Sequence, residues 1–183
     1  MEKKKRVIVC IFMAIVIAGV WILLYIMDNG NQSFDSTLDK YESLGAIKYL
    51  KVSNGDRTEV LIWDGKFWNW EDKPSLGAPQ REVSELLDKV TKELNPRKVE
   101  EELSPEETGL DEAKYEVYLK DANGNEFVIR IGKSTPNGGY YAMLDEKDEI
   151  YTIRRHARKL VDEIIVYRMM IDFDINSSPS LQP

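Results

Sequence analysis

The chain has 183 residues, with 25 basic and 32 acidic side chains, one histidine and one cysteine. Its net charge of −7 makes nucleic acid and a bare anionic lipid surface poor partners. With a single histidine, His156, and a single cysteine, Cys10, the sequence excludes a disulfide framework and leaves too few ligands for an ordinary zinc site.

The first element is an apolar run of 21 residues from Val7 to Met27, which contains no charged side chain. A helix rises about 1.5 Å per residue, so this run is long enough to cross the core of a bilayer. The basic cluster Lys3-Lys4-Lys5-Arg6 is expected to stay in the cytoplasm and to send the rest of the chain outward. A cleaved signal peptide would be shorter and would end in small residues, whereas this run ends in large ones such as Trp21 and Tyr25. The sequence therefore predicts an uncleaved single-pass anchor in the cell membrane.

One modest domain is expected outside the membrane. Residues 1–27 carry four of the basic and one of the acidic side chains, so the remainder has a net charge of −10. That remainder is long enough to bury a single hydrophobic core. The predicted organisation is a cytoplasmic stub (1–6), a transmembrane helix (7–27), a linker (28–37), an extracytoplasmic domain (38–173) and a disordered tail (174–183).

The first half of the outer domain is predicted to be a short helix, a β-meander and a longer helix. Asn54-Gly55 and Asp64-Gly65 lie between alternating apolar residues, which is a strong hairpin signal. Pro79–Leu94 shows apolar residues at helical spacing, and Asn95-Pro96 ends this segment. The short helix is expected within Asp35–Leu44, and the strands over Ala46–Ser53, Arg57–Trp63 and Lys66–Trp70.

The second half repeats this order of elements. Tyr118-Leu119-Lys120 and Asn123-Gly124 follow Tyr49-Leu50-Lys51 and Asn54-Gly55 at a constant offset of 69 residues. The class predicted is α+β, an antiparallel sheet of two β-meander-plus-helix halves with the helices on one face. Later strands are expected near Gly139–Leu144 and Glu149–Ile153, and a closing helix from Arg154 to about Arg168.

Five short motifs follow one another through the outer domain. They are Gly65-Lys66-Phe67-Trp68, the apolar helix after Pro79, Thr108-Gly109-Leu110-Asp111, Ile131-Gly132-Lys133 and Gly138-Gly139-Tyr140-Tyr141. In this order they resemble the DUF4340 family of bacterial domains of unknown function, over roughly residues 38–173. The chain departs from the family's pattern at Glu112-Ala113, where a proline is common.

The resemblance implies an accessory domain of the cell envelope with no established enzyme activity. Members of the family often have one N-terminal membrane helix, and some are linked with ABC-type transport systems or gliding-type envelope machinery. We expect the motif positions to be structural: Gly109, Leu110, Gly132, Lys133, Gly139 and Tyr140.

Four cations cluster where the closing helix is expected to begin: Arg154, Arg155, Arg158 and Lys159. Cations in the first turn oppose the helix dipole, by about 0.3–1 kcal/mol each. We therefore expect nearby negative charge to offset this unfavourable interaction. One candidate is pairing with the acidic hairpin tip Asp145–Glu149, and the other is docking of the four-residue patch to an acidic partner or to lipid phosphates.

Aromatic residues crowd one hairpin, at Trp63, Phe67, Trp68 and Trp70. Trp68 and Trp70 share one face of their strand, and such residues are usually core. An exposed aromatic surface formed by Trp63, Trp68 and Trp70, suited to a glycan or a peptide, is the alternative.

Other motifs favour ordinary structural explanations. His156 lies at the edge of an apolar helical stripe, where a half-buried structural histidine is expected. Asp145–Glu149 lacks the glycine and the distal glutamate of a calcium loop. Gly132-Lys133-Ser134-Thr135 resembles the end of a P-loop, but Phe127 stands where its glycine is needed. Ser104-Pro105-Glu106-Glu107 is expected to open a single helical turn.

Together these features favour a membrane-anchored extracytoplasmic domain that binds or scaffolds envelope proteins, with transporter components among the candidates. We expect no catalytic residue, no metal site, no cofactor and no nucleic-acid partner; the lipid bilayer is a partner through the anchor. An envelope sensor or ligand-binding domain is the alternative function, and a hydrolase is the third. A flat patch would favour a scaffold, a concave apolar pocket a ligand binder, and a deep cleft with convergent polar groups an enzyme.

Overall fold

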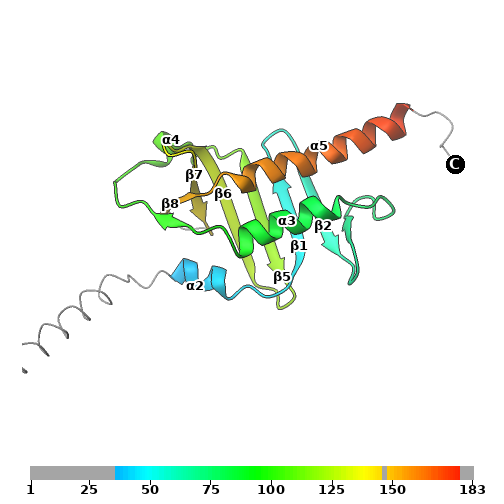
Figure 1. Ribbon diagram of the computed structural model, residues 1–183, viewed down its shortest axis with the longest axis horizontal. Coiled ribbons are helices and arrows are strands. Elements are labelled where there is room, and N and C mark those ends of the chain that lie inside the picture. Colours follow the sequence, from blue (N-terminus) through cyan, green and yellow to red (C-terminus); the bar gives the residue numbers. More distant parts are fainter. Residues whose placement is uncertain (1–35, 146–147, 178–183) are drawn as a thin grey trace, which may run out of the picture. The chain divides into compact units, whose positions relative to one another are not determined.

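Eight strands form one antiparallel sheet, with helices packed against it, in the computed structural model of the chain (Figure 1). The structure describes residues 36–145 and 148–177. The predicted stub, the predicted anchor over 7–27 and nearly all of the predicted linker lie outside these residues. Within the described ranges, no helix is both long enough and apolar enough to span a bilayer. The predicted α+β class is confirmed for this part of the chain.

The sheet has the strand order β3-β2-β1-β5-β6-β7-β8-β4. Strands β1 and β5 lie side by side in the interior of the sheet, with Leu50 opposite Leu119. The two-residue strand β4 pairs with β8 and was not predicted. The strands are β1 (Ile47–Ser53), β2 (Thr58–Trp63), β3 (Trp68–Trp70), β4 (Arg97–Lys98), β5 (Tyr115–Asp121), β6 (Glu126–Ser134), β7 (Tyr140–Leu144) and β8 (Ile150–Ile153).

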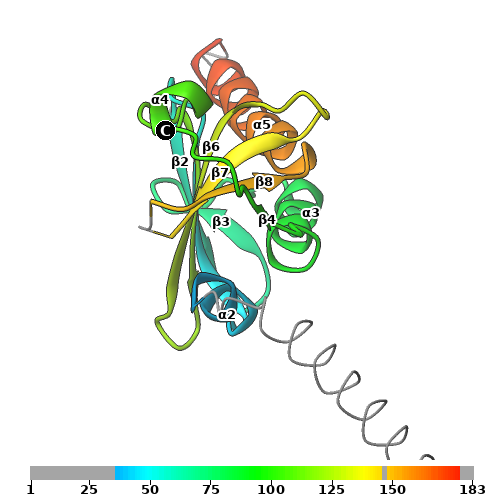
Figure 2. The ribbon, with the colours of Figure 1, turned by 90° about the vertical axis from the view of Figure 1, so that its left-hand side faces the viewer.

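The helices are α2 (Ser36–Glu42), α3 (Gln80–Thr91), α4 (Pro105–Thr108) and α5 (His156–Ser177). Figures 1 and 2 show α3 and α5 side by side over the same face of the sheet. The expected end of the closing helix near Arg168 is wrong, because α5 continues to Ser177. The predicted disordered tail is therefore wrong for residues 174–177, and the remainder of that tail lies outside the described residues.

Both predicted Asn-Gly turns are confirmed as tight connections between paired strands. Gly55, between β1 and β2, has a φ of 89°, and Gly124, between β5 and β6, has a φ of 88°. Only a residue without a Cβ adopts this backbone conformation readily. The Asn54 side chain also accepts hydrogen bonds from the backbone of Asp56 and Arg57, at 3.2 and 3.1 Å.

A buried carboxylate organises the second of these turns. Asp121 accepts hydrogen bonds from the backbone of Gly45, Asn123 and Asn125 and from the side chain of Asn125, at 2.8–2.9 Å. Burial alone would raise its pKa, but these hydrogen bonds outweigh burial and lower the pKa to about 2. Asp121 therefore ties the segment before β1 to the β5–β6 turn.

The core lies between the sheet and the two long helices. Alternate residues of every strand except β4 point into it, which is the period-two pattern of a half-buried strand. Helix α3 buries Val83, Leu86 and Val90, and Gln80 at its start bonds to both backbone groups of Trp68, at 2.7 and 2.8 Å. The largest fully buried side chains are Trp70, Tyr151, Phe127, Leu50, Leu61, Leu86, Leu94, Leu119, Ile129, Ile131, Leu144 and Ile164.

A second, smaller cluster covers the opposite face of β7 and β8, where Leu110, Met143 and Ile150 are buried together. The segment that supplies Leu110 contains α4. The predicted capping box at its start is confirmed, because Ser104 and Glu107 exchange side chain-to-backbone hydrogen bonds at 3.2 and 2.8 Å.

Candidate functional site

The predicted cationic patch surrounds the start of α5. Arg154 and Arg155 precede the helix and are exposed. Lys159, one turn into the helix, is also exposed and pairs with Glu163 at 3.1 Å. The first turn of α5 contains no acidic residue that would complement the helix dipole.

Arg158 differs from the other three cations because it is half-buried. Its guanidinium lies 4.1 Å from the ring centroid of Tyr115 and 5.0 Å from that of Tyr140. The Tyr115 hydroxyl donates to Asp162, at 3.0 Å, in the next turn of the helix. Arg158 therefore anchors α5 to strands β5 and β7, and the open part of the patch consists of Arg154, Arg155 and Lys159.

A broad, open hollow of about 790 Å³ lies beside the patch. Its walls are the segment around β4, the β6–β7 loop and the end of β8 with the start of α5. Four cations, Arg97, Lys98, Arg154 and Arg155, and two glutamates line this surface. Lys98 pairs with Glu149, so the surface keeps a small excess of positive charge in a domain that is acidic overall. Among the lining residues are Asn95, Arg97, Lys98, Glu100, Glu101, Thr135, Asn137, Gly139, Tyr141, Thr152, Arg154, Arg155 and His156.

A second hollow of about 650 Å³ continues around the helix start. Arg155 and His156 line both hollows, while Lys159 and Tyr140 line the second. The side chain of His156 is exposed. The expected half-buried histidine is therefore wrong, because α5 begins at His156 and its first residue faces solvent rather than the sheet.

The acidic hairpin tip does not neutralise the patch in the part of the chain that the structure describes. Asp145 pairs with Lys40 at 2.7 Å, and Glu149 pairs with Lys98 at 2.5 Å. Arg154 acts instead on Glu93, whose pKa is lowered mainly by a hydrogen bond from Lys89 and in smaller part by the charge of Arg154.

The expected core position is confirmed for Trp68 and Trp70, so the alternative of an exposed aromatic surface is wrong for these two of its three residues. Trp68 and Trp70 are buried in the main core. Trp63 is half-buried against Trp68, with ring centroids 5.7 Å apart, and Lys48 lies over its ring. The alternation along β3 points both of its tryptophans toward α3 and the core, so this hairpin offers no aromatic platform.

The motif residues bring α4 and β6 together. Gly109 ends α4 with a φ of 67°, and the Lys133 ammonium donates to the backbone oxygens of Glu106 and Glu107, at 2.9 and 3.1 Å. A Cβ on Gly132 would lie 2.4 Å from the backbone oxygen of Thr108. These contacts give the motif a packing role.

The remaining motif residues lie next to the patch. A Cβ on Gly139 would lie 2.5 Å from the backbone oxygen of Ile153, so only glycine allows the β6–β7 loop to approach the end of β8. Tyr140 follows directly and contacts Arg158. Leu110 is buried in the smaller cluster. The motifs thus support the surface on which the cations lie.

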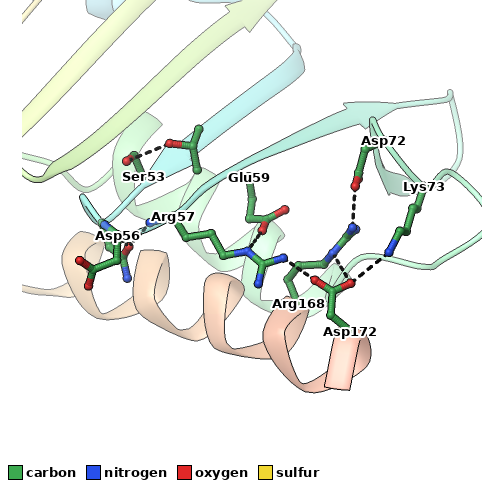
Figure 3. Close-up of polar contacts among 10 residues, drawn as sticks. Ser53, Asp56, Arg57, Glu59, Asp72, Lys73, Arg168 and Asp172 are labelled. Carbon is green, nitrogen blue, oxygen red and sulfur yellow. Dashed lines mark hydrogen bonds and ion pairs between the residues drawn. The ribbon is translucent and has the colours of Figure 1, made fainter. Parts of the chain in front are cut away.

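Sequence reasoning missed a charged network at the other end of α5 (Figure 3). Arg168 is buried, donates to Asp72 at 2.6 Å and lies over the Trp70 ring at 5.1 Å. Its Nε is 3.2 Å from the carboxylate of Asp172. Asp172 also accepts a hydrogen bond from Arg57 and one from Lys73, the latter at 3.3 Å.

The network is close to neutral, because Arg57, Lys73 and Arg168 face the carboxylates of Glu59, Asp72 and Asp172. The hydrogen bond from Arg57 is the largest cause that lowers the pKa of Asp172 to about 2, and Asp172 in turn raises the pKa of Arg57. The one sequence signal for this network is the position of Arg168, which follows Ile164 and Ile165 on the buried stripe of the helix.

Comparison with known proteins identifies one family. The family model described as "Domain of unknown function (DUF4340)" matches residues 68–165, from β3 into α5. Neither the curated proteins nor the solved structures contain a match. Within the described residues, no group of three histidine, cysteine or acidic side chains is arranged to hold a metal ion.

Proposed function

Because the chain belongs to the DUF4340 family of domains of unknown function, which carries no assigned activity, we propose a function from its own surfaces. We propose that it is a single-pass, membrane-anchored scaffold whose outer domain docks an acidic envelope protein through the cationic hollow at the start of α5. The proposal includes an accessory role in an ABC-type transporter or another envelope complex, and it assigns no catalysis and no cofactor.

The observation that carries the proposal is the exposure of Arg154 and Arg155 beside the open hollow. Among the described residues, no ion pair joins either side chain to a carboxylate. Both lie at a helix start, where the dipole disfavours cations and favours an incoming anion. A surface carboxylate of a partner would relieve this repulsion and would be attracted over a distance by the local positive field.

The anchor is proposed from the sequence. Lys3 to Arg6 precede 21 uncharged residues, Val7 to Met27, and the linker before α2 is short. We propose that the N-terminus is cytoplasmic and that the domain from residue 38 lies outside the cell. Protease added to intact, wall-stripped cells should digest the domain. Full protection, or a mature N-terminus near residue 30, would contradict this topology.

The docking test reverses three exposed cations together, as Arg97→Glu, Arg154→Glu and Arg155→Glu. Arg158 is left unchanged because it packs on Tyr115 and Tyr140. The matched control reverses three exposed cations away from the hollow, as Lys66→Glu, Arg81→Glu and Lys114→Glu. Crosslinking in membranes should lose its specific products in the first variant only, while both variants melt near the wild-type temperature. Equal crosslinking by all three proteins would rule out docking through this surface.

A ligand-binding role is the second candidate, because the hollow's volume lies within the range of small-molecule pockets, about 300–1,000 Å³. Its openness and its mixed charges favour a protein surface over a small ligand. Titration of the full chain with inorganic diphosphate separates the two roles. Saturable binding that Arg155→Glu abolishes would favour the ligand-binding role.

We also propose that the two halves of the domain arose by duplication. Each half is a β-meander followed by a helix, and the Asn54-Gly55 and Asn123-Gly124 turns occupy equivalent hairpins. The halves differ in detail, since the first has three strands and the second has four. An experimental structure in which β1–β2 fails to superpose on β5–β6 would reject this origin.

A further inference from the structure

The C-terminal half of α5 presents an apolar stripe to solvent. Val166, Met169, Met170 and Phe173 are 51, 52, 63 and 71 % exposed. Their spacing is i, i+3, i+4 and i+7, which places all four on one side of the helix. Together with Asp174 they line a shallow hollow of about 320 Å³. A continuous stripe of this kind marks an interaction surface more often than isolated exposed residues do.

The opposite side of the same turns is fixed to the domain. Ile164 and Ile165 are buried in the main core, Arg168 bonds to Asp72, and Asp172 bonds to Arg57 and Lys73 (Figure 3). The helix therefore cannot rotate its apolar stripe toward the sheet without breaking these contacts. The stripe is held outward on a rigid support, which lowers the entropic cost of binding a partner.

The position of the stripe separates it from the start of the described chain. In Figures 1 and 2, the last turns of α5 lie at the opposite end of the domain from α2. This arrangement places the stripe far from the first helix of the described chain.

The charge around the stripe indicates what kind of partner fits it. Between Val166 and Ser177 the sequence has one cation, Arg168, and that side chain is only 3 % exposed. Asp174 borders the stripe, and the C-terminal end of a helix carries a partial negative charge. The rim therefore favours a cationic partner and repels the headgroups of anionic lipids.

We propose that this stripe docks a basic amphipathic helix of another protein, one that pairs its own apolar stripe with Val166, Met169, Met170 and Phe173 and places a lysine or arginine against Asp174. This is the helix-on-helix mode of recognition, with anchors at i, i+3, i+4 and i+7. The inference does not depend on the proposed role of the cationic hollow, since the two surfaces share no residue.

A second copy of the chain fits this surface less well. In an antiparallel pair that overlaps the two stripes, the cations in the first turn of α5, Arg158 and Lys159, lie beyond the end of the neighbouring helix. Asp174 would then face a segment of the other copy whose only cation is the buried Arg168. Self-pairing leaves this carboxylate without a cation, whereas a basic helix supplies one.

The experiment uses the full chain in phosphatidylcholine nanodiscs and two synthetic helical peptides. Both peptides carry leucines at i, i+3, i+4 and i+7; one has lysines beside the leucines and the other has glutamates. The lysine peptide should bind at least about tenfold more tightly, because like charges at an interface weaken association. The variant Asp174→Lys should remove or reverse this preference without changing the melting temperature.

The apolar contribution is tested with Met170→Asn combined with Phe173→Ser, which should abolish binding of the lysine peptide. The matched control, Ile62→Asn combined with Phe67→Ser, changes two other exposed apolar residues and should bind as wild type does. Equal binding of the two peptides, or binding of neither, overturns the proposal. So does a wild-type dimer that the stripe variant dissociates, which would identify a second copy as the occupant. Flotation with vesicles that the same variant abolishes would identify lipid instead.

Discussion

The two ends of α5 invert the usual distribution of charged and apolar residues. At its start, Arg154 and Arg155 point into solvent, and the helix packs on the sheet through apolar residues such as Leu160 and Val161. Near its end, Arg168 lies inside and Met170 and Phe173 lie outside. A cation is tolerated inside only because Asp72, from a neighbouring segment, and Asp172, one turn further along the same helix, supply carboxylates.

This difference shows that one helix carries two surfaces of opposite character. The first end repels cations and favours anions, whereas the second end is apolar and bordered by a carboxylate. The two docking roles proposed above therefore call for partners of unlike chemistry, an acidic one at the start of the helix and a basic one near its end. The variants below test how each end is held in place.

The largest effect is expected at the buried end. Arg168→Ala removes a packed side chain and the partner of Asp72, so it should lower the free energy of unfolding by about 3 kcal/mol. Arg168→Met keeps most of the volume, and Asp172 retains Arg57 and Lys73, so its cost should be about 1 kcal/mol. Urea unfolding of the two variants measures both. A methionine variant as unstable as the alanine variant would show that charge, rather than packing, dominates at this position.

A smaller effect, with a pH signature, is expected for Asp172→Asn. The pKa of Asp172 is about 2 when folded, below the ordinary value near 3.8. Its contribution is therefore complete above about pH 5 and is lost as the pH falls toward 2. Because the side chain is partly exposed, we expect about 1–2 kcal/mol at pH 7. Unfolding measured from pH 7 to pH 2 should show the variant and the wild type converging, whereas a constant gap would contradict this. Asp174→Asn controls for the loss of a negative charge at this helix end.

At the other end of the helix, Arg158→Met should cost about 1 kcal/mol, through the loss of its contacts with the rings of Tyr115 and Tyr140. Thermal unfolding of this variant, of Tyr140→Leu and of the double variant measures the coupling between the two side chains. Strict additivity would mean that the ring and the guanidinium do not interact.

The smallest effects are expected for the exposed residues at the helix start. Arg154→Ala, Arg155→Ala and His156→Gln should each change the free energy of unfolding by no more than about 0.5 kcal/mol. Chemical denaturation is the appropriate measurement. A loss above about 1 kcal/mol in any of them would indicate a structural role and would weaken the case for a docking surface.

Much of this fold is readable from local sequence signals. Asn54-Gly55 and Asn123-Gly124 identified two hairpins, and the period of Val83, Leu86 and Val90 identified α3. The end of α5 was not readable, because Asp172 and Asp174 after a methionine pair resemble the polar end of a helix. The partners that hold this end, Arg57 and Lys73, are about a hundred residues away in the sequence.

The candidate surfaces were readable only in part. The cluster of cations after β8 is visible in the sequence, but nothing local shows that Arg158 packs on Tyr115 and Tyr140. The burial of the tryptophans also depends on a tertiary contact, because α3 covers the side of β3 that carries Trp68 and Trp70. The sequence also did not predict the exposed apolar stripe of Val166, Met169, Met170 and Phe173, because most of it lies on the part of α5 beyond the expected end of the helix.

The sheet ends on both sides in very short strands, with three residues in β3 and two in β4. On the outer side of β3, an isolated bridge joins Asn69 to Gly77 and occupies part of that edge. Long free edges invite neighbouring chains to add strands and to aggregate, so such short edges reduce this risk. They also leave little backbone for recognition by strand addition, which directs binding toward side chains on the helical layer.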